Sequence, residues 1–454
     1  MSDNQDKPPV KLGFIGLAAL TFGMMVGAGI FNIPQNMAAS AGAGAVALSW
    51  LITAAGMLLL VLTFKKLTDR RPDLNAGIYQ YAAEGFGAYA GFNMAWGYWL
   101  CTAFANVAYA VMLNDTVGAF FPSLLAHGWE TVIFGTILIW LYYFIVASGM
   151  KTAKLLTVLL SVVKIASIAL IVLLLALNFK FETFRLFDLT ETSGLGEQIR
   201  GTMLVTLWCF IGIEGASIMA GRAKRTSDIG KATIVGFFAA WILYFLVSLL
   251  CYGVMTRPEL AGLKDPSVAY ALREIIGQWA YWMVIVSVII SLGGGWVAWT
   301  LVCAEVPYAA ARVGILPRVF MRLNRQGMPA YGLCFSSIVM TLFLMLVMTA
   351  DDVYLAALNI TGMMILPCYL FSGLYLWKSA RGASRWVGMA CSLFCGWMIY
   401  AGGLSLFMQT SLFYLMGFGF YIAARRQQRV RLLNGKETVT FALLVFVAVV
   451  SLLF

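Results

Sequence analysis

The chain has 454 residues, of which 61% are hydrophobic and 11% are charged. A soluble domain carries about 25% charged residues, so the composition excludes a soluble protein and indicates a helical protein that crosses a membrane many times. The net charge of +11 does not indicate nucleic-acid binding, because the charges are sorted by side. With a cytoplasmic N-terminus, 24 of the 31 Lys and Arg residues lie inside and 6 outside. This positive-inside bias predicts a multi-pass protein of the cell inner (plasma) membrane, in contact with the lipid bilayer.

Twelve apolar stretches predict membrane spans, and most reach the roughly 20 residues that a bilayer requires. They lie at about 13–36, 43–64, 90–116, 131–149, 155–178, 201–220, 233–255, 279–304, 331–349, 353–377, 386–408 and 411–424. Residues 437–454 form an apolar tail that could be a thirteenth span or an interfacial helix. The expected division is a cytoplasmic N-terminus at 1–12, a ten-helix core at 13–377, two additional helices at 386–424, and a basic segment with the apolar tail at 425–454.

Glycines interrupt the first span within Leu20–Pro34, LTFGMMVGAGIFNIP. Gly23, Gly27 and Gly29 each cost roughly 1 kcal/mol of helix stability relative to alanine, and a membrane span needs its backbone hydrogen bonds satisfied. An unwound midpoint would expose backbone N–H and C=O groups, and the positive end of a half-helix could hold a carboxylate. The alternative is a glycine face against which another helix packs closely.

A second interrupted span follows five spans later, at Thr202–Gly221, TMLVTLWCFIGIEGASIMAG. Gly212 and Gly215 flank Glu214 at its middle. Paired glycine-broken helices at corresponding positions indicate a transporter built from two inverted five-helix repeats, with the substrate held between the broken helices 1 and 6. The predicted fold is therefore all-α, with about 12 spans in a 5+5 inverted repeat and two further helices.

Enzymatic chemistry has little support in the residues. The eight cysteines lie in apolar runs without metal-ligand spacing, and His127 is the only histidine. The chain has no HExxH or GxSxG motif, so we expect no catalytic residues, no metal and no cofactor. A nutrient sensor that binds without transporting stays open as an alternative.

Four ordered motifs carry a family resemblance: GAGIFNIP, GYWLCTAFANVAY, LWCFIGIEGAS and WTLVCAEVPYAAARVGILP. The chain resembles the amino acid–polyamine–organocation transporters, in particular the basic amino acid/polyamine antiporters, and within them the bacterial arginine/ornithine antiporters. The resemblance implies a ten-helix inverted-repeat core plus two helices, and electroneutral or near-electroneutral exchange of one substrate for another. It leaves open whether the protein forms a homodimer.

Two charged residues lie inside predicted spans. A carboxylate at mid-membrane costs about 2.5–3.5 kcal/mol, so Glu214 should face a cavity or a partner; the resemblance implies that it responds to protons beside the substrate path. The alternative is a structural hydrogen bond to a neighbouring helix. For Lys164 the resemblance implies an ammonium that takes the place of a sodium ion, bridging span 5 to the broken span 1 and to span 8. Its alternative is snorkelling towards the cytoplasm.

The resemblance also implies a pocket for a basic substrate. Trp208 would stack on the cation as a lid, with Trp299 and Tyr98 as further pocket aromatics, because an indole face attracts a guanidinium or ammonium by roughly 0.5–2 kcal/mol. Packing is the alternative for each ring. Asn106 matches a position that hydrogen-bonds the side-chain end of the substrate, although an Asn in an apolar span can equally join helices.

The remaining candidate substrate contacts lie in the interrupted segments and in span 10. Ala28 stands where some relatives have a serine, so the backbone of Gly27, Ala28, Gly29 and Ile30 would bind the carboxylate alone. Cys209, Ile211 and Thr361 complete the predicted site. We predict a secondary exchanger of cationic amino acids, with arginine/ornithine as the first choice. The alternatives are an amino acid/amine exchanger (histidine/histamine or lysine/cadaverine) and a proton-coupled basic amino acid permease.

Overall fold

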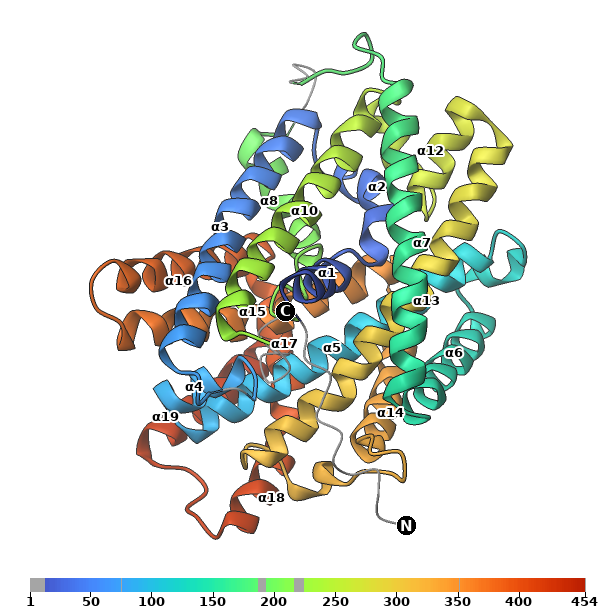
Figure 1. Cartoon of the computed structure of the whole chain (residues 1–454). Coiled ribbons are helices and arrows are strands. Elements are labelled where there is room, and N and C mark those ends of the chain that lie inside the picture. Colours follow the sequence, from blue (N-terminus) through green and yellow to red (C-terminus); the bar gives the residue numbers. More distant parts are fainter. Residues whose placement is uncertain (1–12, 75, 187–192, 216–223, 351, 454) are drawn as a thin grey trace.

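The fold is seen in a computed structural model of the chain (Figure 1). The structure describes residues 13–453 apart from 75, 187–192, 216–223 and 351. In this part of the chain all regular secondary structure is helical, which confirms the predicted fold class.

The first half of the chain folds into the helices of predicted spans 1–5 and their connections. The elements are α1 (Phe14–Met25), η1 (Ala28–Phe31), α2 (Ile33–Ala38), α3 (Ala43–Arg70), α4 (Tyr79–Phe86), α5 (Ala88–Val117), η2 (Pro122–Ala126), α6 (Trp129–Ala147) and α7 (Met150–Leu177). Spans 6–10 follow as α8 (Leu195–Trp208), α10 (Thr226–Tyr252), α11 (Arg257–Ala261), α12 (Ser267–Ile276), α13 (Gln278–Arg312), η4 (Arg318–Met321), α14 (Ala330–Val347) and α15 (Val353–Ser379).

The C-terminal helices differ from the predicted boundaries. They are α16 (Ala383–Ala401), α17 (Leu404–Met416), α18 (Phe418–Gln428) and α19 (Gly435–Ser451). The predicted span at 386–408 is wrong at its end, because Gly403 has φ 100°, a left-handed conformation that glycine adopts without strain, and the chain turns there. The predicted span at 411–424 is instead the pair α17 and α18, joined at Gly417. The apolar tail is helical, and whether it crosses the membrane stays a prediction.

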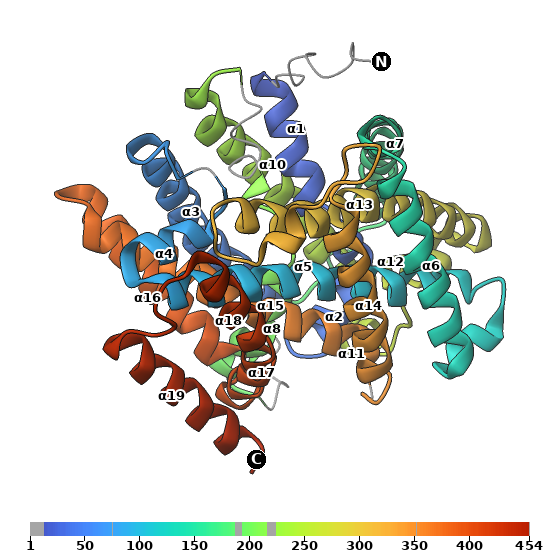
Figure 2. The same ribbon diagram turned by 90° about the horizontal axis from the view of Figure 1, so that it is seen from below.

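α5 runs through the middle of the molecule in both ribbon views (Figures 1 and 2). Of its 30 residues, all but three are buried, and it packs against α13 and α15. The other helices therefore shield it from lipid, which permits the polar residues that it carries. α19 lies at the edge of the bundle, away from α7 (Figure 2).

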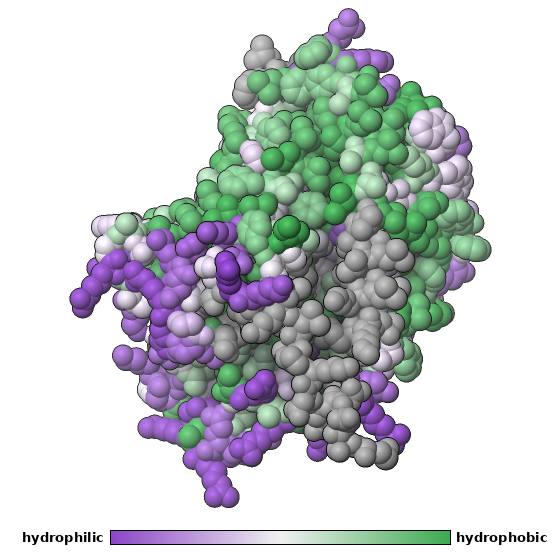
Figure 3. Space-filling model, viewed as in Figure 1, coloured by the Kyte–Doolittle hydropathy of each residue, from purple (hydrophilic) through white to green (hydrophobic). Residues whose placement is uncertain are grey.

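The outer surface fits a lipid environment. Among the described residues, seven helical stretches are long and apolar enough to cross a membrane: α3, α6, α10, α13, α14, α15 and the stretch Leu404–Gln428. Hydrophobic residues cover the upper part of the face in Figure 3, and hydrophilic residues gather at the lower left. This sorting is the expected surface of a helical membrane protein.

A repeated corner relates the two halves of the core. α4 meets α5 at Gly87 (φ 104°, ψ 173°), and α12 meets α13 at Gly277 (φ 110°, ψ −176°). These dihedrals are open to glycine and strained for other residues. Because α5 and α13 are five spans apart, the shared corner is what a 5+5 repeat predicts.

Candidate functional site

The first span breaks between α1 and α2, as its glycines predict. α1 ends at Met25, and the chain continues through Val26 and Gly27 (φ −110°, ψ −143°) into the short helix η1. The break frees carbonyl groups that other helices bind. The Tyr244 hydroxyl of α10 donates to the Met25 carbonyl at 2.7 Å, so buried backbone polar groups exposed by the break still find partners.

Lys164 of α7 binds the same break. Its side chain is 2% exposed, and Nζ donates to the carbonyl oxygens of Gly23 (3.1 Å) and Val26 (2.5 Å). These carbonyls lie at the C-terminal end of α1, which carries negative partial charge and stabilises a cation. These two hydrogen bonds form the predicted bridge from span 5 to span 1. The predicted contact of Lys164 with span 8 stays a prediction.

The second break follows α8, which ends at Trp208. The backbone then makes tight three-residue turns, in which the Ile211 N–H donates to the Trp208 carbonyl (3.2 Å) and the Gly215 N–H to that of Gly212 (2.9 Å). Gly212 has φ 106°, and a Cβ there would lie 3.0 Å from the Met24 carbonyl carbon, so both conformation and space require glycine. The second half of this predicted span, residues 216–223, lies outside the described residues.

The two breaks enclose a small cavity of about 10 Å³. Its walls are Met24, Met25, Gly27 and Gly29 from the first break, Trp208 and Ile211 from the second, Ala105 and Tyr109 from α5, and Trp299 from α13. This volume holds roughly one water molecule. The described arrangement is thus a closed one, and an amino acid enters only if these walls move apart.

Trp208 closes the cavity on the first break. A Cβ on Gly29 would lie 2.9 Å from Trp208 Nε1 and 3.8 Å from Cys209 Sγ, so glycine is what allows the indole to approach the backbone. Ile30 is buried, and Ala28 contributes its backbone to η1. The structure therefore brings the predicted backbone segment and both predicted tryptophans together.

Glu214 lies outside the cavity wall and joins three elements. It is 0% exposed; Oε1 accepts a hydrogen bond from the Tyr98 hydroxyl of α5 (2.8 Å), and Oε2 from the Tyr369 hydroxyl of α15 (2.9 Å). The Gly212 N–H also donates to Oε2 (3.3 Å). Tyr98 thus lies against Glu214 and does not line the small cavity, and its contact with substrate stays a prediction. We call Glu214, Tyr98 and Tyr369 the carboxylate clamp.

Two predicted residues lie away from the cavity wall. Asn106 Nδ2 donates to the Thr102 carbonyl (2.7 Å), and its Oδ1 accepts from the Thr300 hydroxyl of α13 (3.1 Å). The first bond lies within α5, and the bond with Thr300 joins α5 to α13, which is the alternative that the sequence left open. The Thr361 hydroxyl donates to the Ala357 carbonyl of its own helix (2.7 Å). Substrate contact by Asn106 and Thr361 stays a prediction.

Three tyrosines near the site were missed from the sequence. Tyr109 lies four residues after Ala105 and so on the same face of α5, a helical spacing that could have found it. Tyr244 and Tyr369 lie in strongly apolar spans, and only the need of a buried hydroxyl for a partner pointed to them.

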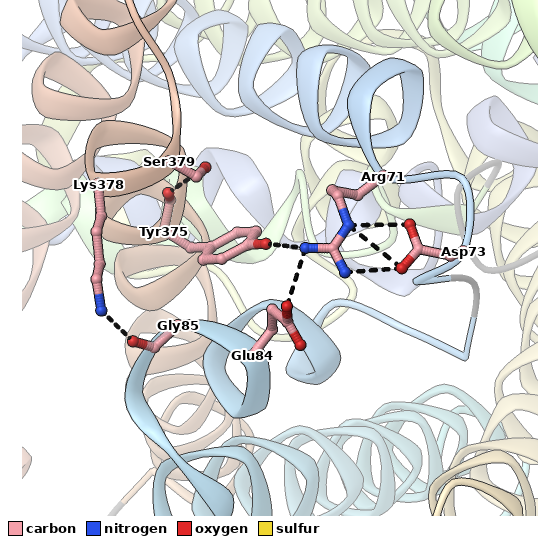
Figure 4. A network of polar contacts seen from close by, with 7 residues as sticks. All are labelled: Arg71, Asp73, Glu84, Gly85, Tyr375, Lys378 and Ser379. Atoms are coloured by element: carbon pink, nitrogen blue, oxygen red, sulfur yellow. Dashed lines mark hydrogen bonds and ion pairs between the residues drawn. The ribbon is translucent and has the colours of Figure 1, made fainter.

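A polar network joins the ends of α3, α4 and α15 at one end of the bundle (Figure 4). Arg71, directly after α3, donates to Asp73 (2.7 Å), to Glu84 of α4 (3.0 Å) and to the Tyr375 hydroxyl of α15 (2.7 Å). Lys378 donates to the Gly85 carbonyl (2.6 Å). The hydrogen bond from Arg71 holds the pKa of Asp73 below its usual value. We call this the Arg71 network.

Comparison with known proteins decides the family. A family profile described as "Amino acid permease" matches residues 12–449. The chain belongs to the amino acid permease family. This family is part of the amino acid–polyamine–organocation superfamily, so the resemblance carried by the four motifs is confirmed.

Two relatives show how far the likeness to other permeases extends. An arginine/agmatine antiporter of Chlamydia caviae is 38% identical over 473 residues, covering 99% of this chain and 97% of that protein. An arginine/agmatine antiporter of Chlamydia trachomatis serovar L2 is 38% identical over 468 residues, covering 98% and 96%. This permease is therefore a multi-pass membrane transporter.

A solved structure shares the architecture. A nucleobase-cation-symport-1 family transporter, in a closed conformation with bromovinylhydantoin bound, has a TM-score of 0.56 at 16% identity, covering 96% of this chain and 98% of that one. At this identity the likeness concerns the fold alone.

Proposed function

We propose that this permease exchanges a cationic amino acid for a cationic amine across the inner membrane, with arginine and agmatine as the pair. The observation that carries the proposal is the closed cavity between two interrupted helices, covered by Trp208 and bordered by Trp299. The relatives named arginine/agmatine antiporters favour the amine class of exchanger, which the sequence kept as an alternative, over ornithine.

The backbone of the first break suits the amino acid end of the substrate. Residues 28–30 are the first turn of η1, and N–H groups of a first helical turn have no partner within the helix. They also carry positive partial charge. A carboxylate seated on Gly27, Ala28, Gly29 and Ile30 would accept from these groups without a charged side chain.

The walls of the cavity suit two exchanged substrates that differ in net positive charge. Among the described residues that line the cavity none is acidic, and Trp208 and Trp299 offer indole faces. An indole attracts a cation by roughly 0.5–2 kcal/mol and carries no fixed charge. A site of this kind holds both a monocationic amino acid and a dicationic amine, which is what exchange of the two requires.

The carboxylate clamp and Lys164 would control opening. The clamp ties α5 and α15 to the second break, so separating these elements must break hydrogen bonds to a buried carboxylate. Protonation of Glu214 would weaken its role as a double acceptor and ease that step. Lys164 would hold the first break where a sodium ion would otherwise bind.

The proposed orientation places the N-terminus and the Arg71 network in the cytoplasm. Of the 31 Lys and Arg residues, 24 then lie inside and 6 outside, as the positive-inside rule requires. The opposite end of the bundle, where α5 ends and α15 begins, would then face outwards.

Reconstituted vesicles test the function. Purified permease is placed in vesicles loaded with agmatine, with ornithine, or with buffer alone, and uptake of labelled arginine is followed. We expect rapid uptake with internal agmatine and little in empty vesicles. Equal uptake in empty and loaded vesicles would overturn the exchange proposal, and faster uptake with ornithine than with agmatine would overturn the amine assignment.

A further inference from the structure

The end of the bundle opposite the Arg71 network contains a hollow of about 280 Å³. Segments far apart in the sequence line it: Gln35 of α2, Asp115 of α5, His127 after η2, Lys264 and Asp265 before α12, and Tyr354 at the start of α15 with Asp352 before it. We call this hollow the acidic vestibule. It lies near the transport path, because Tyr109 of the cavity wall and Asp115 of the vestibule are six residues apart on α5, which is about 9 Å along a helix.

The vestibule carries more negative than positive charge. Asp115, Asp265 and Asp352 all line it, and the positive neighbours are Lys264 and the protonated form of His127. Asp115 is engaged, since Oδ1 lies 2.7 Å from His127 Nε2. Asp352 accepts from the Leu355 N–H at 2.8 Å and so caps α15. Neither contact involves Asp265.

Polar atoms in the vestibule wall lack partners. The Tyr354 hydroxyl is buried, with the side chain 2% exposed, and makes no hydrogen bond within the described part of the chain. Gln35 Oε1 and Asp265 Oδ1 are also buried atoms without a hydrogen-bond partner among the described residues. A buried polar group without a partner costs about 1–3 kcal/mol. Such groups around one hollow indicate a polar ligand.

Asp265 shows which charge that ligand would carry. Burial raises the pKa of this carboxyl well above its usual value, and the neighbouring Asp115 and Asp352 raise it further. A cation placed among the three would offset this repulsion and favour the charged carboxylate.

The arrangement favours an extended organic cation over a metal ion. No group of three or more His, Cys, Asp or Glu side chains in the described residues converges closely enough to hold a metal. The vestibule carboxylates are instead spread over separate elements around the hollow. A diamine or a guanidino-amine carries two positive ends, which suits carboxylates that come from separate elements.

We propose that the acidic vestibule is a second, peripheral binding site that captures the cationic substrate before it enters the cavity between the broken helices. This inference rests on the proposed exchange function. A dication should gain most, because the carboxylate of an amino acid is repelled by the same residues. Capture at a charged cleft raises the rate of association and so lowers KM, and salt weakens it.

Four single substitutions test the site in right-side-out vesicles preloaded with unlabelled arginine. Asp265→Asn removes the carboxyl group that a bound cation would keep ionised, and Asp352→Asn keeps a side chain that caps helices well. Lys264→Gln removes the positive neighbour. The matched control is Glu182→Gln, an exposed acid in the α7–α8 connection that does not line the vestibule.

For each variant we expect a defined direction of change in the KM for external substrate. Asp265→Asn and Asp352→Asn should each raise the KM for external agmatine roughly three- to tenfold, with a smaller rise for arginine and an unchanged maximal rate. Lys264→Gln should lower the KM, Glu182→Gln should leave it unchanged, and the differences should shrink at high salt.

Two results would overturn the vestibule site. One is a KM that neither aspartate substitution changes, and the other is an equal rise in the Glu182→Gln control. If either result occurs while the wild-type protein exchanges its substrates normally, the vestibule site is refuted and the exchange function still stands. Absence of load-dependent exchange in the wild-type protein would instead refute the proposed function itself.

Discussion

The Arg71 network and the acidic vestibule lie at opposite ends of one bundle and differ in how their charges are satisfied. Arg71 has three partners on neighbouring elements (Figure 4). In the vestibule, Asp265 Oδ1 and the Tyr354 hydroxyl have none among the described residues. Hollows of about 260 Å³ and 490 Å³ also border the Arg71 network, lined in part by Glu84 and Lys378. The two ends therefore differ in the pairing of their charges, not in whether they are hollow.

α15 connects the two ends. Tyr354 lies at its vestibule end, Tyr369 binds Glu214 in its middle, and Tyr375 accepts from Arg71 near its other end. A shift of this one helix would change all three layers together. The comparison thus predicts graded effects, largest at the carboxylate clamp and smallest at the ends.

Breaking the carboxylate clamp should have the largest effect. Glu214→Gln retains the size of the side chain but accepts well on one side only, so one buried tyrosine hydroxyl loses its partner at a cost of about 1–3 kcal/mol. Opening becomes easier in this variant, but the clamp must form again each time the site closes over its substrate, so we expect exchange of arginine to fall at least roughly tenfold per folded molecule, since 1.4 kcal/mol is tenfold. Tyr369→Phe should show a milder loss. The exposed Glu274→Gln is the control, and full activity of Glu214→Gln would contradict the clamp.

Removing the ammonium that holds the first break should come next. Lys164→Met keeps an apolar stem but leaves the Gly23 and Val26 carbonyls without their donor. We expect the free energy of unfolding to fall by about 2–4 kcal/mol, measured as heat denaturation in detergent. The exposed Lys180→Met should change it little. Equal melting temperatures for the two variants would place Lys164 at the membrane surface, as in the snorkelling alternative.

Disrupting the Arg71 network tests whether its polar contacts restrict access to the interior from this end of the bundle. Arg71→Gln removes the contacts to Asp73, Glu84 and Tyr375, and exposed ion pairs contribute little each. We expect the buried thiols near the clamp, Cys101 and Cys368, to react about two- to fivefold faster with a reagent added at the cytoplasmic side. Arg273→Gln, which breaks an exposed pair with Glu274, should leave that rate unchanged. No acceleration in Arg71→Gln would show that the network does not close this end.

The smallest expected effect is a pH dependence at the vestibule. The hydrogen bond to Asp115 raises the pKa of His127 above its usual 6.5. A raised pKa in the folded state stabilises the protein fully below pH 6.5 and loses that contribution as the pH rises through the folded-state value. Because the imidazole is partly exposed, we expect the melting temperature to drop by roughly 1–2 °C between pH 6 and pH 8. The His127→Gln variant should lack this drop in melting temperature. An identical drop in the variant would show that another titratable group causes it.

The sequence predicted the parts of the site that depend on local chemistry. Gly27 and Gly212 revealed the two breaks because glycine is costly inside a span, and Glu214 and Lys164 were conspicuous because charge is costly there. Tyr369 was not predicted as the partner of Glu214, since the two are 155 residues apart and only the packing of α15 joins them.

The vestibule could not be predicted from the sequence, because its residues also lie far apart in the chain and meet only in the fold. Asp115 lies in the last turn of α5, and Asp265 and Asp352 lie in two separate connections between helices, where an acidic residue is ordinary. The end of α16 was missed because apolar residues continue past Gly402 and Gly403, and hydropathy does not register a change of chain direction.

The central claim is that a cationic substrate binds between the broken helices against two indole rings. Equilibrium binding of arginine to the purified protein tests it with Trp208→Leu, Trp299→Leu and, as control, Trp386→Leu, whose ring is 63% exposed. The account predicts that each cavity variant weakens binding roughly 2- to 30-fold, while the control binds like the wild type. Unchanged affinity in both cavity variants would contradict it.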